Sequence, residues 1–117
     1  MPITSGQLRE RVRLERRTPQ KDGFGNSVSA WQAQFERRAA VQMMRGGEEV
    51  LASRLEGVQP ATIVLRFDEK TRAITADWRA IHLRDDGSER EFAIQTAEDM
   101  EGRRQWITLT CKAGVAS

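Results

Sequence analysis

Residues 78–96 read WRAIHLRDDGSEREFAIQT, two apolar-rich runs separated by the turn-forming stretch DDGSE. An Asp-Gly pair between two such runs is typical of the tight connection that joins neighbouring antiparallel strands. The sequence therefore predicts a β-hairpin with strands at residues 78–84 and 90–96.

A further strand is predicted at residues 106–112, WITLTCK. Ile107, Leu109 and Cys111 alternate there with polar or aromatic neighbours, and a two-residue period places alternate side chains on one face of a sheet. No helical pattern separates these last strands, which favours an antiparallel sheet over a parallel α/β fold.

Upstream of this region, three segments carry strand patterns. In the first, Val12 and Leu14 alternate with charged residues, as in a half-buried strand. In the second, the same alternation places Trp31, Ala33 and Phe35 together on the apolar face. The predicted strands cover residues 9–18, 28–44 and 62–67.

The segment GGEEVLASRLEG, residues 46–57, is the one with a helical period. Val50, Leu51 and Leu55 form an apolar stripe, acidic residues occupy the first turn, and a glycine can end the helix. We expect a short helix at about residues 47–57, whereas residues 68–77 are expected to be irregular or to contain a single helical turn.

Together these segments predict an all-β protein, a small antiparallel β-barrel of about six strands with one short α-helix and long loops. The length of 117 residues suits a single domain spanning residues 1–117. The residues expected in its core are Leu14, Ile63, Leu65, Ile94, Ile107 and Leu109.

Composition limits the functions that the chain can have. Nineteen basic against 17 acidic side chains leave a net charge of +2, which allows nucleic-acid binding without indicating it. One cysteine cannot form an internal disulfide, no apolar stretch is long enough to span a membrane, and the first residues lack a secretory signal. We expect a protein made and used in the cytosol.

The sequence offers no convincing catalytic, metal or cofactor site. The single His82 and Cys111 lack the spacing of metal ligands. Their strand positions predict that they point to opposite sides of the sheet, with Cys111 a buried structural thiol. The glycines at 23 and 25 lack the remaining residues of a nucleotide loop. We therefore expect no enzyme activity, metal or cofactor.

The stretch QKDGFGNSV, residues 20–28, is longer than a tight hairpin needs, and it carries an aromatic ring among turn-forming residues. On a protruding tip the ring of Phe24 would serve as a contact residue, whereas a tip folded back onto the barrel would bury it. Both readings remain open at this stage. The candidate interaction residues are Lys21, Asp22, Gly23, Phe24, Gly25 and Asn26.

The order of these features resembles the phage head-tail joining proteins, also called head closure or connector proteins. The matching segments are LRERVRLERRT at residues 8–18, DGFGNSVSAW at 22–31, the Gly-Gly-Glu helix start at 46–48, TIVLRF at 62–67 and WITLTCK at 106–112. The resemblance covers residues 6–111. It implies a small β-barrel with long loops.

The resemblance also implies a structural role in the virion. Proteins of this family form a ring at the neck of the particle, between the portal or adaptor and the tail terminator or tail tube. There they close the DNA-filled head and provide the tail attachment site. The expected partners are those proteins and, within the particle, further copies of the chain, whereas the isolated protein is expected to be a monomer. DNA is expected only as the passing genome, and no membrane is involved. Assembly would take place in the host cytoplasm.

Charged residues supply candidate contacts between subunits. Arginines on the first strand could face acidic residues near the last turn of a neighbouring copy. The candidates are Arg9, Arg11, Arg13, Glu98, Asp99 and Glu101. The alternatives are a small-barrel nucleic-acid-binding protein, against which the low aromatic content argues, and a Cys-dependent enzyme.

Overall fold

The computed structural model describes residues 6, 8–21, 23, 27–44, 57–99, 102 and 104–114, with the backbone alone at 19–21 and 27–29. Within residues 8–114 as described, the chain forms six strands and the 3-10 turn η2. They are β1 (Glu10–Lys21), β2 (Ser27–Met43), β3 (Gln59–Arg66), η2 (Thr71–Ala73), β4 (Trp78–Leu83), β5 (Glu89–Glu98) and β6 (Trp106–Ala113).

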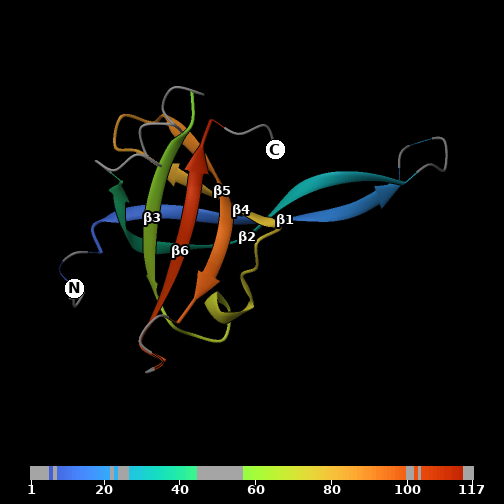
Figure 1. Cartoon of the computed structure of the whole chain (residues 1–117). Coiled ribbons are helices and arrows are strands. Elements are labelled where there is room, and N and C mark those ends of the chain that lie inside the picture. The colour runs from blue at the N-terminus through green and yellow to red at the C-terminus, as the bar shows by residue number, and fades with distance from the viewer. Residues whose placement is uncertain are drawn as a thin grey trace.

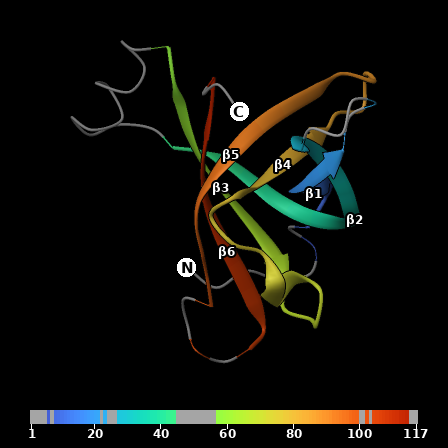
Figure 2. The ribbon, with the colours of Figure 1, turned by 90° about the vertical axis from the view of Figure 1, so that its right-hand side faces the viewer.

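The strands close into an antiparallel barrel in the order β1-β2-β3-β6-β5-β4 (Figure 1). Every strand pair is antiparallel. Figure 2 shows β5 running diagonally across the barrel toward the hairpin that it forms with β4. The predicted fold class is confirmed, and closure leaves the barrel itself without an open edge.

The core lies inside the barrel and contains all six residues predicted for it. Each is at most 5% exposed: Leu14, Ile63, Leu65, Ile94, Ile107 and Leu109. Four further large side chains have no exposed surface: Val12, Thr71, Phe92 and Cys111. On β6 the burial alternates strictly from Trp106 to Ala113, as the two-residue period predicts.

A β-bulge in β2 overturns one prediction about side-chain direction. Leu14 pairs with Phe35, but the next residue of β1, Glu15, pairs with Ala33, so Gln34 is an extra residue. The extra residue shifts the alternation by one. Phe35 packs against the core, whereas Trp31 and Ala33 lie on the opposite, outer face with Glu15.

The predicted β4–β5 hairpin is formed, with a tight turn at residues 84–88. The Arg84 N–H donates to the Ser88 carbonyl at 2.9 Å, and Asp86 accepts from the Ser88 N–H at 2.9 Å. Gly87 has φ +87°, a conformation that L residues other than glycine adopt at a cost.

The segment before β4 contains the single helical turn, η2. The Asp68 carboxylate accepts hydrogen bonds from the N–H groups of Lys70 and Thr71, both at 2.8 Å, which begins the turn. Thr71 is fully buried and donates to the Arg66 carbonyl. The helix predicted at residues 47–57 lies outside the described residues, apart from Gly57.

Gly114 makes a close approach that predicts a measurable cost of substitution. A Cβ there would lie 2.5 Å from the Gly57 carbonyl oxygen, and φ is +88°. Gly87 has nearly the same φ, but a Cβ there would meet no atom within 4 Å. We expect Gly87→Ala to cost about 1 to 2 kcal/mol from its backbone conformation alone. Gly114→Ala should cost clearly more in urea denaturation, and equal losses would contradict the close approach.

Candidate functional site

The β1–β2 hairpin projects beyond the barrel as an arm. β1 pairs with β4 as far as Arg16, opposite Trp78, and then continues with β2 for five more residue pairs, ending at Lys21 opposite Ser27. Figure 1 shows this arm in blue and cyan, extending away from the other strands. Within the described residues, β2 from Ser27 to Arg38 pairs with β1 alone.

The predicted contact loop lies at the end of this arm. Lys21 is the last residue of β1, and Gly23 is an exposed turn residue with open space around it. Asp22, Phe24, Gly25 and Asn26 lie outside the described residues. The structure therefore establishes the reach of the arm, while the role of Phe24 stays a prediction.

Trp31 marks the base of the arm. Two guanidinium groups contact its ring, with Arg17 at 4.8 Å and Arg79 at 4.5 Å from the ring centroid. Both distances are those of favourable cation–π contacts. A hollow of about 370 Å³ adjoins this stack and is lined by Arg17, Trp31, Ala76, Asp77, Trp78, Arg79 and Ala93.

A chain of ion pairs runs across the outer face of β1, β4 and β5. Glu15 lies at its centre, with only 8% of its side chain exposed, and accepts from Arg13 at 2.8 Å and Arg79 at 2.6 Å. Arg13 also pairs with Glu89, and Arg79 with Glu91, both at 3.0 Å. The chain ties the root of the arm to the β4–β5 hairpin.

The pKa of Glu15 reflects two opposing effects. Burial alone would raise the pKa of this carboxyl group, but the hydrogen bonds from Arg13 and Arg79 outweigh it and hold the pKa below its usual value. The pKa of Arg13 is raised by its hydrogen bonds to Glu89 and Glu15. Glu15 is therefore ionised at neutral pH.

Replacing this central carboxylate should weaken the fold. We expect Glu15→Gln to cost about 1.5 to 3 kcal/mol at pH 7, because the amide cannot replace two charge-assisted hydrogen bonds. The exposed Glu69→Gln, between β3 and η2, is the control and should change stability by less than about 0.5 kcal/mol.

The stabilisation should also depend on pH in a defined direction. A carboxyl group with a depressed native pKa stabilises the fold above its unfolded pKa of about 4.3 and loses this effect as the pH falls through the native pKa. The difference in unfolding free energy between the wild type and Glu15→Gln should therefore shrink between pH 5 and more acidic buffers. A difference that does not change with pH would contradict this assignment.

Two of the candidate arginines lie in an exposed basic patch at the other end of β1. Arg11 is directly opposite Arg38 of β2, and both are exposed, as is Arg9. Like charges directly opposite each other are unfavourable unless an anion compensates them. Arg38 was not among the sequence candidates, because its pairing with Arg11 depends on the strand register. Arg13, by contrast, is held in ion pairs within the chain.

The acidic candidates lie around the end of β5. Glu98 is its last residue and is exposed, and the Asp99 carboxylate accepts from the Arg104 N–H at 2.8 Å. Glu101 lies outside the described residues. Within the chain, no ion pair joins the described acidic candidates to Arg9 or Arg11.

The prediction that His82 and Cys111 point to opposite sides of the sheet is wrong. His82 shares the inner face of β4 with Trp78 and Ala80, and its Nε2 lies 2.9 Å from the Glu10 carboxylate. The apolar neighbour Ile81 faces outward and is nevertheless 2% exposed, since it lies between Arg13 and Glu91 on adjacent strands.

Cys111 is buried as predicted, and its burial raises the pKa of the thiol to about 12. Such a thiol is protonated at neutral pH and is a poor nucleophile. The described residues hold no group of three or more His, Cys, Asp or Glu side chains placed to bind a metal ion. They also include no helix long and apolar enough to cross a membrane.

Comparison with solved structures identifies several similar folds, among them the following two. The solution structure of protein SF1141 from Shigella flexneri 2a is 20% identical in sequence, covering 98% of this chain and 100% of that chain with a TM-score of 0.71. A chain of the virion of a native gene transfer agent particle is 24% identical, covering 91% and 94% with a TM-score of 0.58. A comparison with curated proteins finds no significant match.

The sequence was also compared with models of protein families. The model of the phage head completion proteins matches residues 3–114. This match confirms the resemblance inferred from the order of the sequence segments. Because the match covers nearly the entire sequence, the chain belongs to the phage head completion protein family.

Proposed function

We propose that the chain is a structural component of a phage, prophage or phage-like particle that closes the DNA-filled head at its neck. The observation that carries the proposal is the family match over residues 3–114. A chain of a gene transfer agent virion has a similar fold, which supports a place in a particle of this kind. The proposed role is structural and needs no catalytic group.

In this proposal many copies form a ring between the portal or adaptor and the tail terminator or tail tube. Cyclic assembly repeats each weak contact in every subunit, so that the combined attachment becomes very strong. DNA passes the ring as the genome and is not a sequence-specific ligand.

The arm and the charged patches are the proposed contact surfaces. The arm carries Lys21 and Gly23 away from the barrel, and in this proposal the loop at residues 21–26 contacts the portal side, a neighbouring subunit or the channel. The basic patch of Arg9, Arg11 and Arg38 would face the acidic end of β5, Glu98 and Asp99, in the next copy. Complementary charge of this kind fixes the orientation of an interface.

Deleting the gene from its phage or prophage tests this function. We expect heads that package DNA but lose it or fail to join tails, and we expect the phenotype to be restored by the gene supplied in trans. Normal yields of tailed, infectious or transducing particles from the deletion would refute the proposal.

The nucleic-acid-binding alternative is tested separately by salt dependence. A protein that binds phosphates loses DNA affinity steeply between low and physiological salt. We expect the purified protein to show little affinity for duplex or single-stranded DNA under either condition. Strong binding at low salt that falls steeply with added salt would favour the alternative.

A further inference from the structure

The barrel wall has a hollow at the end of β6. β6 ends at Ala113, which pairs with Gln59 of β3 on one side and Phe92 of β5 on the other. The pairing of β5 with β6 ends at Phe92, and the three residues of β5 before it, 89–91, have no partner in β6. The wall is interrupted at this point. The resulting hollow holds about 600 Å³ and is lined by Gly57, Gln59, Glu89, Arg90, Glu91, Ala113 and Gly114.

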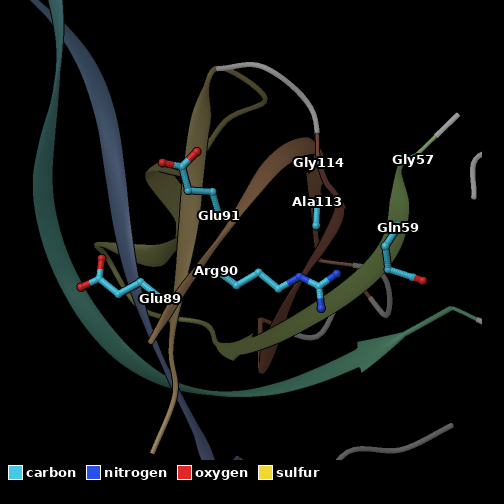
Figure 3. A pocket seen from close by; sticks show the side chains of 7 residues that line it. All are labelled: Gly57, Gln59, Glu89, Arg90, Glu91, Ala113 and Gly114. Atoms are coloured by element: carbon cyan, nitrogen blue, oxygen red, sulfur yellow. The ribbon is translucent and has the colours of Figure 1, made fainter. Parts of the chain in front are cut away.

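Arg90 is the charged side chain that enters this hollow. It belongs to the inner face of β5, and Figure 3 shows its guanidinium extending across the hollow toward Gln59. Its guanidinium carbon lies 5.5 Å from the centroid of the Phe92 ring, a contact that holds the side chain in this direction. Within the described part of the chain, the side chain of Arg90 has no hydrogen bond or ion pair.

The acidic residues of the hollow are directed elsewhere. In Figure 3 the carboxylates of Glu89 and Glu91 point away from the guanidinium. They pair instead with Arg13 and Arg79, each at 3.0 Å, in the ion-pair chain on the outer face. Gln59 is also held in place, since its side-chain amide donates to the Pro60 carbonyl at 2.8 Å.

We propose that this hollow is a binding site for the carboxylate of an acidic side chain supplied by a partner polypeptide. A half-buried guanidinium offers a carboxylate two parallel hydrogen bonds, which are among the stronger polar contacts in proteins. A polyanion such as DNA fits poorly, because the two glutamates at the rim would repel its successive phosphates. A single carboxylate meets Arg90 without bringing further charge to the rim.

The site is tested on the folded protein with a small ligand, independently of any particle. N-acetyl-glutamate amide carries the proposed side chain, and N-acetyl-glutamine amide is its uncharged counterpart. Titration is followed by the backbone amide resonances of Gly57 and Gly114, which line the hollow. We expect saturable shifts at these glycines with the glutamate compound and none with the glutamine compound.

Two variants locate the effect on Arg90. Arg90→Gln should weaken binding about tenfold or more, because it removes both charged hydrogen bonds. Arg90→Lys should retain part of the affinity, and Arg84→Gln in the exposed β4–β5 turn is the matched control. The comparison of the two compounds on the wild-type protein needs no variant, so a folding defect in one variant leaves the test decisive.

The outcomes that overturn the proposal are distinct. Equal shifts with both compounds, or unchanged affinity in Arg90→Gln, would exclude recognition of the carboxylate by Arg90. The absence of saturable shifts would mean that the hollow does not accept this ligand, as when another part of the chain already fills it. Tighter saturable binding of inorganic phosphate would reassign the site. None of these results bears on the proposed role in head closure.

Discussion

Replacing residues 21–26 by a short Asn-Gly turn should leave the barrel folded and abolish the joining of heads to tails. The last five pairs of the arm, from Arg17 to Lys21, lie beyond the strand pairing with β4. A shorter tip therefore removes little buried surface, and loop tips tolerate changes of length. The variant lacks the phenyl group of Phe24 and the full length of the arm. This loss is repeated in every subunit of the assembled ring.

The measurements are the thermal melt of the purified variant and the yield of infectious or transducing particles. We expect an unchanged melting temperature, with packaged heads that lack tails or lose their genome. Phe24→Ala in the full-length loop is the matched variant, since it removes the ring but keeps the reach. If Phe24 instead folds back onto the barrel, the melting temperature falls first. Normal stability together with normal particle yield would contradict a contact role of the loop.

Leu109→Ala should destabilise the barrel by about 2 to 5 kcal/mol. Leu109 is fully buried on β6, where it is paired with Ile63 on one side and Ala97 on the other. Truncation there removes buried methyl groups and leaves a cavity, and the surrounding side chains of a closed barrel can fill this cavity only in part. Urea denaturation gives the loss of unfolding free energy directly.

Thr110→Ala is the control for this substitution. Thr110 is the next residue of β6 and points to the outer face, where it is only partly buried. We expect its replacement to cost about 0.5 kcal/mol or less. Equal losses at the two positions would refute the assignment of the inner and outer faces of β6. Leu109→Ala also shows how far reduced stability, with an intact arm, affects particle yield.

The strands were predictable because one face of each is buried in a common core. The alternation in residues 106–112 predicted both the strand and its inner face correctly. The runs on either side of the 85–89 turn predicted the hairpin, but the inner face of β4 carries His82 with Trp78 and Ala80, not Ile81. Strand ends were less well predicted: β1 continues to Lys21 and β3 begins at Gln59, before Pro60. In both cases the hydrogen bonds to the neighbouring strand, β2 for β1 and β6 for β3, continue through residues whose side chains show no apolar alternation.

The bulges could not be read from the sequence. An extra residue at Gln34 shifts the alternation in β2 without any change in residue type, so Trp31 moved to the outer face. The same holds for the irregularity between Ile94 and Thr96 in β5. A bulge depends on the register with a neighbouring strand, which a single segment does not contain.

The candidate site was predictable where it depends on neighbours along the chain. The turn-forming residues predicted a loop at 21–26, and Gly23 is a turn residue at the end of the arm, whereas Asp22 and residues 24–26 lie outside the described residues. The buried Glu15 was read only as one charge among the arginines of β1. Its partner Arg79 is 64 residues away, so the pair becomes visible only when β1 and β4 lie side by side. The same is true of Arg11 and Arg38.

The central claim, that the chain completes the phage head, is tested most directly by imaging particles that carry a tagged copy of it. Electron microscopy of purified particles, with the tag marked by a labelled antibody fragment, locates the protein. The account predicts a ring of label at the neck, between portal and tail, and none on tail fibres or the capsid surface. Particles that are complete and tailed but contain no tagged protein, or carry it elsewhere, would contradict the account.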